Sequence, residues 1–342
     1  MKDVRDYSLL AHNTFGIDAK CKRFLEYSSV EEAQQIVAGL TAADQPLLIL
    51  GGGSNLLLTG DYEGTVIHSA IKGIKVLDNE KLHSSDSVFL SCGSGEVFDD
   101  VVAYAVEHGY HGAENLSIIP GEVGASAVQN IGAYGVEAKD IIYKVEAVEI
   151  ATGKVVVFDN QDCQYSYRQS RFKHEWKDKY LVTHVIYRLS KHFVPDLDYG
   201  NIRTSLAAKK IGNPTAQQLR DVIIEIRNAK LPDPKVQGNA GSFFMNPIVQ
   251  KAKYEELAAL YPGMPHYTID AEHEKIPAGW MIDQCGWKGQ SLGRAGVHDK
   301  QALVLVNRGG ATGGEIVNLC ETIRKDVKQK FGIDIHPEVN VK

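Results

Sequence analysis

The sequence lacks any hydrophobic run long enough to cross a membrane. Its longest apolar segment, ALVLV at 302–306, has the length of a strand, whereas a membrane-spanning helix needs about 18 residues or more. The first residues also lack the apolar core of a signal peptide, because polar or charged side chains interrupt each short apolar stretch. We therefore expect a cytoplasmic protein with no membrane partner.

An excess of positive charge is also missing. The chain has 37 Lys and Arg against 43 Asp and Glu, which gives a net charge of −6 and argues against a nucleic-acid-binding protein. Hydrophobic residues make up 44% and charged residues 23%, as in ordinary folded proteins, so a disordered chain or a coiled coil is excluded. A length of 342 residues predicts two or three domains.

Cysteine pairs and metal-binding motifs are absent. The five cysteines are scattered and form no C-x-x-C pair, and the 12 histidines include no H-E-x-x-H, so neither a disulfide framework nor a zinc site is indicated. We expect buried thiols and no metal. The two common nucleotide-binding fingerprints, G-x-G-x-x-G opening a helix and G-x-x-x-x-G-K-[ST], are missing as well.

Local patterns predict a chain of mixed helices and strands. Capping boxes at Ser29/Glu32 and Thr215/Gln218 each mark the start of a helix, and the second helix must end before Pro232. The region 190–214 is the expected domain boundary. The other expected elements are strands at 47–50, 88–92 and 180–189, a hairpin of 144–150 with 154–158, helices at 96–108, 251–261, 277–285 and 314–331, and a strand-like tail at 333–341.

Two glycine-rich segments carry the chemical signal. LLILGGGSN at 47–55 runs from a buried strand into three glycines, whose N–H groups could converge on a pyrophosphate; a simple tight turn is the alternative. PGEVGASAVQNIGAYG at 120–135 combines four glycines with the amides of Gln129 and Asn130, which suits a planar heterocycle lying against the backbone.

One motif is misleading. GQSLG at 289–293 matches the G-x-S-x-G pattern of serine hydrolases, but it follows a helical segment and leads into no helix. The strand–turn–helix context that such a nucleophile needs is missing. A serine hydrolase is therefore not expected.

The motifs together resemble one family closely, the UDP-N-acetylenolpyruvoylglucosamine reductases. The blocks occur in the family's order and span nearly the whole chain: NTFGID (13–18), LGGGSN (50–55), IPGEVGASAVQNIGAYG (119–135), YRQSRF (167–172), LPDPKVQGNAGSFFMNP (231–247), AGWMIDQCGWKG (278–289) and HPEV (336–339). LDYGN (197–201) looks like the tyrosine-bearing loop of the type I subgroup.

The resemblance implies an α+β fold, with a two-subdomain FAD-binding module of the vanillyl-alcohol-oxidase type and an α+β substrate domain. It assigns 1–66 with 332–342 to the first FAD-binding subdomain, 67–200 to the second, and 201–331 to the linker and substrate domain. It also implies that bound FAD, reduced by NADPH, reduces UDP-N-acetylenolpyruvoylglucosamine to UDP-N-acetylmuramate for peptidoglycan synthesis, with NADPH and substrate using one pocket in turn. No histidine lies in GGGSN, so FAD is expected to bind non-covalently, and we expect a monomer.

Site residues follow from the matched motifs. The resemblance implies that Arg168 stabilises the substrate carboxylate, Ser242 donates the proton, and Glu338 polarises the substrate or assists proton movement. Substrate contacts would come from Tyr199, Arg227, Lys230, Asn246 and Gln301. FAD contacts would come from Gly51, Gly52, Gly53, Ser54, Asn55, Pro120, Gly121, Gly124, Ala125, Ser126, Asn130, Gly132, Ala133, Tyr134 and Gly135.

Without the resemblance, ordinary roles would fit these residues. Arg168 would belong to a solvated basic patch, Ser242 to a turn, and Glu338 to the surface, while Lys230 and Lys235 would be loop charges rather than contacts to a diphosphate. Two other functions remain as alternatives. One is another flavin oxidoreductase of this fold, such as a sugar or lactone oxidase, and the other is a catalytically silent flavin- or UDP-sugar-binding protein.

Overall fold

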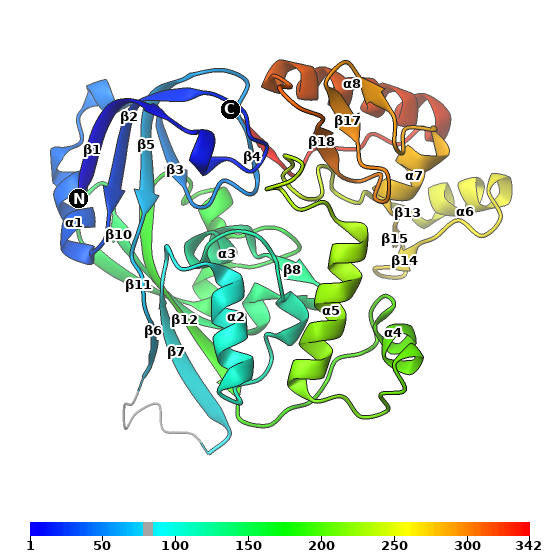
Figure 1. Ribbon diagram of the computed structural model, residues 1–342, viewed down its shortest axis with the longest axis horizontal. Coiled ribbons are helices and arrows are strands. Elements are labelled where there is room, and N and C mark those ends of the chain that lie inside the picture. The colour runs from blue at the N-terminus through cyan, green and yellow to red at the C-terminus, as the bar shows by residue number, and fades with distance from the viewer. Residues whose placement is uncertain (78–84) are drawn as a thin grey trace. The chain divides into compact units, whose positions relative to one another are not determined.

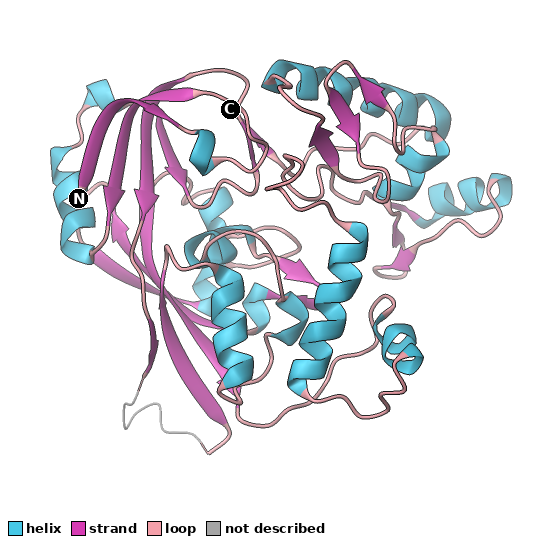
Figure 2. Cartoon of the chain, in the orientation of Figure 1, coloured by secondary structure: helices cyan, strands magenta, loops and turns pink. Residues whose placement is uncertain are grey.

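The computed structural model of the chain describes residues 1–77 and 85–342, which form two compact units (Figures 1 and 2). The first unit comprises Met1–Tyr7, Cys21–Gly52 and Glu63–Ala229, and the second comprises Ser8–Lys20, Gly53–Tyr62 and Lys230–Lys342. Both units mix helices and strands, as the α+β prediction requires. The finer three-part division stays a prediction.

The first unit begins with a four-stranded sheet. Its strand order is β1 (Lys2–Ser8), β2 (Lys20–Tyr27), β5 (Tyr62–Ser69) and β3 (Leu47–Leu50), with β3 and β5 parallel. The helix α1 (Val30–Gly39) precedes β3, and the Ser29 hydroxyl accepts a hydrogen bond from the Glu32 N–H as predicted. The buried face of α1 packs against Leu25, Tyr27 and Leu47, which fixes the strand that leads into GGGSN.

A second sheet of the first unit is wholly antiparallel. Its order is β11 (Val155–Asp159), β10 (Ile142–Glu149), β12 (Tyr180–Ser190), β7 (Ser87–Gly93) and β6 (Ile74–Val76), and the predicted hairpin of β10 and β11 is confirmed. Two helices, α2 (Phe98–Glu107) and α3 (Val123–Gln129), bury apolar side chains in one core with these strands. The second glycine-rich segment, which includes α3, is therefore anchored to the sheet through this shared core.

Two further helices complete the first unit. Thr215 and Gln218 exchange side-chain and backbone hydrogen bonds at the start of α5 (Ala216–Lys230), and this helix ends before Pro232 as predicted. The Arg220 guanidinium of α5 donates to both carboxylate oxygens of Asp99 in α2, at 2.7 and 2.9 Å. The short helix α4 (Ile202–Ala208) packs against α5, inside the region where only a boundary was expected.

The second unit contains three α-helices, two three-stranded sheets and one two-stranded pair among the described residues. The helices are α6 (Lys251–Leu260), α7 (Ala278–Gln284) and α8 (Gly313–Phe331), and the predicted stop at Gly332 is confirmed by its φ of 68°. The sheet orders are β13 (Ile248–Gln250), β15 (His273–Lys275), β14 (Tyr267–Thr268), and β16 (Ser291–Leu292), β17 (Ala295–Val297), β18 (Leu305–Asn307). The GQSLG motif lies in the β16–β17 hairpin, so it is not a nucleophile elbow.

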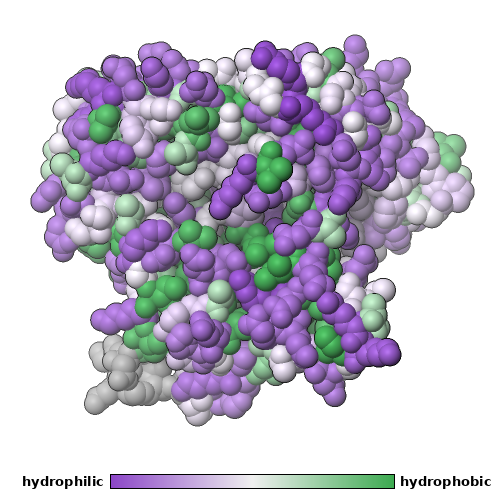
Figure 3. All heavy atoms as spheres, viewed as in Figure 1, coloured by the Kyte–Doolittle hydropathy of each residue, from purple (hydrophilic) through white to green (hydrophobic). Residues whose placement is uncertain are grey.

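The end of the chain returns to the residues that follow GGGSN. β19 (Asn340–Val341) pairs in parallel with β4 (Leu56–Leu57), and these are the only two tail residues in a strand, fewer than the predicted 333–341. Cys21, Cys92, Cys163 and Cys320 are buried as predicted, whereas Cys285 is half-buried. The face drawn in Figure 3 is largely hydrophilic, and no helix in the described parts has the length and apolarity of a membrane span.

Candidate active site

The first part of GGGSN lies directly against the second glycine-rich segment within the first unit. A Cβ atom added to Gly51 would meet the Cβ of Ala125 at 3.2 Å, and one added to Gly52 would meet the Cα of Gly121 at 3.6 Å. A Cβ at Gly51 would crowd Ala125, whereas one at Gly52 would reach ordinary van der Waals contact with Gly121. The two glycine-rich segments therefore form one cradle of backbone, of the kind that accepts a phosphate group.

The rest of GGGSN belongs to the second unit. Gly53 has a φ of +64°, and a Cβ here would lie 1.9 Å from the His12 carbonyl oxygen, so only glycine fits. The Gly53 carbonyl accepts a hydrogen bond from the Thr14 N–H at 3.2 Å, which joins GGGSN to the NTFGID block. The Asn55 carbonyl accepts from the Asn340 N–H at 3.1 Å, so the motif is held from both sides.

The second glycine-rich segment forms a short helix and a tight hairpin. α3 ends at Asn130, which adopts the left-handed conformation with a φ of 45°, and the hairpin of β8 (Gly132–Ala133) and β9 (Val136–Glu137) turns at Tyr134, whose φ is 49°. The Ser126 hydroxyl is buried and bonded to the Val123 carbonyl and the Tyr187 hydroxyl. The buried Oε1 atom of Gln129 has no hydrogen-bond partner among the described residues, as expected of an atom waiting for a ligand.

Arg168 is held at a strained position over this hairpin. Its backbone has a φ of 57°, which is unfavourable for a residue with a side chain, and such strain is concentrated at functional sites. Its guanidinium donates to the Gly132 carbonyl at 2.7 Å and the Asn130 carbonyl at 3.4 Å. The Asn130 side chain in turn donates to the Ser166 carbonyl at 2.8 Å. Asn130 and Gly132, both predicted FAD contacts, therefore position the predicted catalytic arginine.

A second arginine lies close to the first. Arg227 interacts electrostatically with Arg168 and Tyr134, and burial lowers the pKa of its guanidinium. The buried Nε atom of Arg227 has no partner among the described residues. Two cations near each other in a partly buried site attract an anion, because it relieves their mutual repulsion. The structure thus brings together two residues that the resemblance assigned separately to catalysis and to substrate binding.

Tyr199 lies beside the same hairpin. Its ring makes an edge contact with that of Tyr134, with 6.4 Å between centroids, and the Tyr199 side chain is 40% exposed. Gly135 faces the Cβ of Tyr199, at 3.6 Å from an added Cβ atom. An exposed phenol next to the arginine pair can cover a bound anion.

In the second unit, Ser242 and Glu338 lie on two paired backbone segments. The Glu338 N–H donates to the Phe243 carbonyl at 2.8 Å, and the Met245 N–H donates to the His336 carbonyl at 2.9 Å. Phe243 also donates its N–H to the Leu303 carbonyl at 2.8 Å, and its ring is buried. Ser242 itself is exposed. Two of the three predicted catalytic residues are thus brought together in the second unit, while Arg168 belongs to the first.

Two predicted substrate contacts meet at the start of α7. Asn246 accepts a hydrogen bond from the Ala278 N–H at 2.9 Å, and the Oε1 of Gln301 would lie 3.1 Å from a Cβ atom on Gly279. Lys230 ends α5 and, like Lys235, is exposed. Among the described residues, the structure gives neither lysine a role beyond that of a surface charge.

A buried ion-pair network lies beneath the glycine cradle, and sequence reasoning missed it. His68, which is 8% exposed, places its Nδ1 2.9 Å from a Glu26 carboxylate oxygen and its Nε2 3.2 Å from Glu122 Oε1. Burial opposes the charged imidazolium, but the two carboxylates outweigh it and raise the pKa of His68 above 6.5. Because these residues are 42 and 54 positions apart in the chain, no local pattern could have revealed the network.

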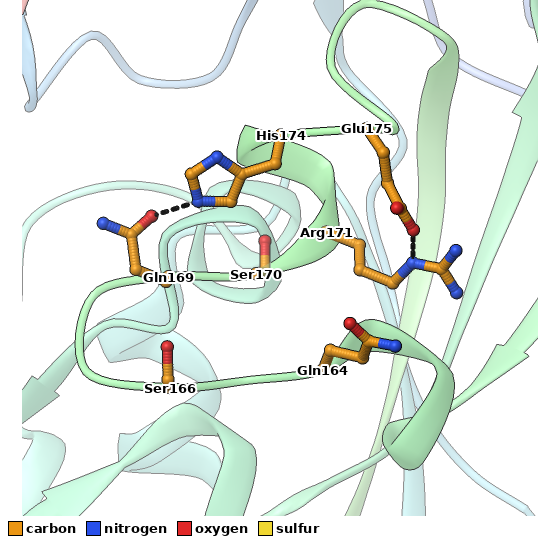
Figure 4. Close-up of a pocket in the computed structure, with 7 residues that line it drawn as sticks. All are labelled: Gln164, Ser166, Gln169, Ser170, Arg171, His174 and Glu175. Atoms are coloured by element: carbon orange, nitrogen blue, oxygen red, sulfur yellow. Dashed lines mark hydrogen bonds and ion pairs between the residues drawn. The ribbon is translucent and has the colours of Figure 1, made fainter.

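A shallow polar hollow lies on the loop that carries Arg168. Its lining residues are Gln164, Ser166, Gln169, Ser170, Arg171, His174 and Glu175 (Figure 4). His174 and Gln169 are joined by a 2.8 Å hydrogen bond, and Arg171 is paired with Glu175. These polar side chains are already paired with each other, and no cluster of metal-ligating side chains exists in the described parts of the chain.

The residues present fit FAD. The cradle of Gly51, Gly52 and Gly121 would accept its pyrophosphate, and the unpartnered Gln129 carbonyl would accept a hydrogen bond from the edge of its ring system.

Comparisons with known proteins agree with this geometry. Residues 22–159 match a family model described as an FAD binding domain, and residues 233–342 match one described as "UDP-N-acetylenolpyruvoylglucosamine reductase, C-terminal domain". The chain is 57% identical over 334 residues to the UDP-N-acetylenolpyruvoylglucosamine reductase of Bacteroides fragilis, covering 98% of each chain. It is 47% identical over 338 residues to that of Porphyromonas gingivalis, again with 98% coverage of both.

A solved structure agrees in fold. The crystal structure of UDP-N-acetylenolpyruvylglucosamine reductase from Thermus caldophilus matches with a TM-score of 0.66 at 21% identity, over 99% of this chain and 98% of that one. The predicted fold class, an α+β protein with an FAD-binding module, is confirmed.

Proposed function

The chain belongs to the UDP-N-acetylenolpyruvoylglucosamine reductase family of FAD-dependent oxidoreductases, and we propose that it reduces the enolpyruvyl ether of UDP-N-acetylenolpyruvoylglucosamine with NADPH. The product is UDP-N-acetylmuramate, a precursor of peptidoglycan. The observation that carries the proposal is the 57% identity over 334 residues, which cover 98% of both chains. FAD, which the cradle of Gly51, Gly52 and Gly121 would hold, would supply the hydride for this reduction, with NADPH as its source.

Arg168 stabilises the negative charge that develops in the substrate. When hydride adds to the terminal carbon of the enolpyruvyl group, electron density moves onto the neighbouring carbon and its carboxylate. A guanidinium already fixed by the Gly132 and Asn130 carbonyls needs little reorganisation to meet that charge. Arg227, close to Arg168, adds positive charge at the same place.

Ser242 donates the proton that completes the reaction. Its hydroxyl delivers a proton to the carbon next to the carboxylate, so hydride and proton together saturate the double bond. Glu338, on the paired segment, assists proton movement to or from the Ser242 Oγ. Tyr199, Arg227, Lys230, Asn246 and Gln301 bind the sugar nucleotide, and Tyr199 closes over its diphosphate.

The way FAD is bound, the location of the protein and its oligomeric state are also part of the proposal. We expect FAD to be bound non-covalently by a cytoplasmic monomer, with Gly51–Asn55 and the residues assigned between Pro120 and Gly135 as its contacts. NADPH and the sugar nucleotide would use the same pocket in succession.

An anaerobic titration tests this function. NADPH should bleach the flavin absorbance of the purified protein, and subsequent addition of UDP-N-acetylenolpyruvoylglucosamine should restore it. UDP-N-acetylglucosamine, which lacks the enolpyruvyl group, is the control and should restore nothing. Bleaching without recovery by the enolpyruvyl compound would contradict the proposal and favour another flavin oxidoreductase.

A further inference from the structure

The carboxylate of Glu122 lies against the glycine cradle. A Cβ atom on Gly51 would be 3.4 Å from Glu122 Oε2, and one on Gly52 would be 3.7 Å from Oε1. The Glu122 side chain is only 15% exposed, and its Oε2 atom is buried without a hydrogen-bond partner among the described residues. An anionic side chain at this place is unexpected, because it would repel the pyrophosphate of the cofactor.

His68 offsets this charge. Its ring lies between Glu122 on one side and Glu26 on the other, at 3.2 and 2.9 Å, and the Phe24 ring stacks on it at 6.1 Å. With an imidazolium, the three side chains carry one net negative charge; with a neutral imidazole, they carry two. The proton on His68 therefore halves the negative charge beneath the cradle.

We propose that His68 and Glu122 couple FAD binding to protonation of His68. The imidazolium of His68 neutralises Glu122 beneath Gly51 and Gly52. When His68 loses this proton, the affinity of the cradle for the FAD pyrophosphate falls. The proposal rests on FAD binding, which the flavin absorbance of the purified protein checks independently. His68 and Glu122 act as positioning residues for the cofactor site, and neither has a step in the proposed reaction.

The direction of the pH effect follows from the groups around His68. Glu122 and Glu26 face its two ring nitrogens, and Lys2 interacts with Glu26 from β1. The carboxylates raise the pKa of His68 above 6.5. The imidazolium is therefore present below that raised pKa and is lost as the pH rises through it. FAD should bind more tightly at low pH and less tightly above the pKa.

The test measures the dissociation constant of FAD for the refolded or FAD-depleted full chain between pH 6 and 9.5, from the fluorescence of free FAD. We expect the wild-type constant to rise by about fivefold or more with increasing pH, the lower end of typical coupling between two sites. H68Q should bind FAD weakly at every pH, near the wild-type value at high pH, because both carboxylates stay charged.

Two further variants separate charge from shape. H68Q/E122Q leaves Glu26 as the only charge in the network, so it should bind FAD as the wild type does at low pH, without the pH dependence. E122Q should bind FAD at least as tightly as the wild type, and its pH midpoint should shift downward because His68 loses one carboxylate.

Several results would overturn the proposal. These are a wild-type dissociation constant that does not change with pH, an H68Q variant that keeps the wild-type profile, or an E122Q variant with weaker binding and an unmoved midpoint. Circular dichroism of each apoprotein checks folding. If H68Q fails to fold, the midpoint of E122Q still decides the question.

Discussion

The positions of individual side chains explain why Arg168 suits its proposed role. In the sequence it is one of several basic residues, and a solvated patch would explain it equally well. In the structure its backbone is strained, with a φ of 57°, and its guanidinium is fixed by two carbonyl groups of the second glycine-rich segment. A surface charge needs neither feature. Fixed hydrogen bonds preorganise a group that stabilises charge, and strained backbone is concentrated at functional sites.

The sequence predicted which residues belong to the site better than it predicted the hydrogen-bond partners of those residues. The motifs identified Asn130 only as an FAD contact, but its amide also anchors the loop of Arg168 through the Ser166 carbonyl, 36 positions away. His68 and Glu122 were not identified at all. Such contacts depend on how distant segments pack, and neither spacing nor composition within one segment records that.

Ser242→Ala should separate the two halves of the reaction. Reduction of FAD by NADPH needs no proton delivered to the substrate carbon, so rapid mixing should show bleaching close to the wild-type rate. Reoxidation by the enolpyruvyl substrate should slow by about 10²- to 10⁴-fold, the usual effect of losing a positioned acid, or about 3 to 5.5 kcal/mol of barrier.

Ser291→Ala is the matched control, because Ser291 is an exposed serine in β16 of the same unit. It should leave both half-reactions unchanged. Reoxidation of the Ser242 variant within a few-fold of the wild type would mean that Ser242 is a turn residue and not the proton donor.

Helices with explicit end signals were predicted accurately. The capping boxes at Ser29 and Thr215 begin α1 and α5, and Gly332 ends α8 in the left-handed conformation. These signals are local: a side chain and a backbone group three residues apart satisfy each other regardless of the rest of the fold.

Elements without such signals were missed. α3 spans Val123 to Gln129, where Gly124, Ser126 and the valines weaken the helical propensity of two alanines, and packing against β12 and β7 stabilises it. α4 lies in the expected boundary 190–214 and is held by its contacts with α5. Tertiary packing stabilises both helices, so local propensity could not have predicted them.

Thr312→Ala should destabilise α8. The Thr312 hydroxyl accepts from the Glu315 N–H, and the Glu315 carboxylate accepts from the Thr312 N–H. The substitution removes the hydroxyl half of this capping box and leaves the backbone half. We expect a loss of about 1 kcal/mol in the free energy of unfolding. Thr322→Ala is the control in the same helix, since the Thr322 hydroxyl bonds only back to the Asn318 carbonyl. If both variants lowered the free energy of unfolding by the same amount in urea denaturation, the capping role of Thr312 would be contradicted.

At the scale of the whole molecule, chain order and spatial order differ. The second unit collects 8–20, 53–62 and 230–342, and its C-terminal strand pairs with residues that follow GGGSN. The resemblance to known reductases implied that the end of the chain returns to the part predicted to bind the flavin. No local pattern could have predicted this pairing, because a parallel pair of two-residue strands carries almost no sequence signal. The same unit also holds Ser242 and Glu338, which are 96 positions apart in the sequence.

The most direct test of the account is the identity of the product. The purified chain, NADPH and UDP-N-acetylenolpyruvoylglucosamine should yield, by mass spectrometry, a compound that has gained two hydrogen atoms. With the reaction run in deuterium oxide, one solvent deuterium should appear on the carbon next to the carboxylate. A substrate recovered unchanged while NADPH is oxidised in its presence, or a product hydrolysed rather than reduced, would contradict the account.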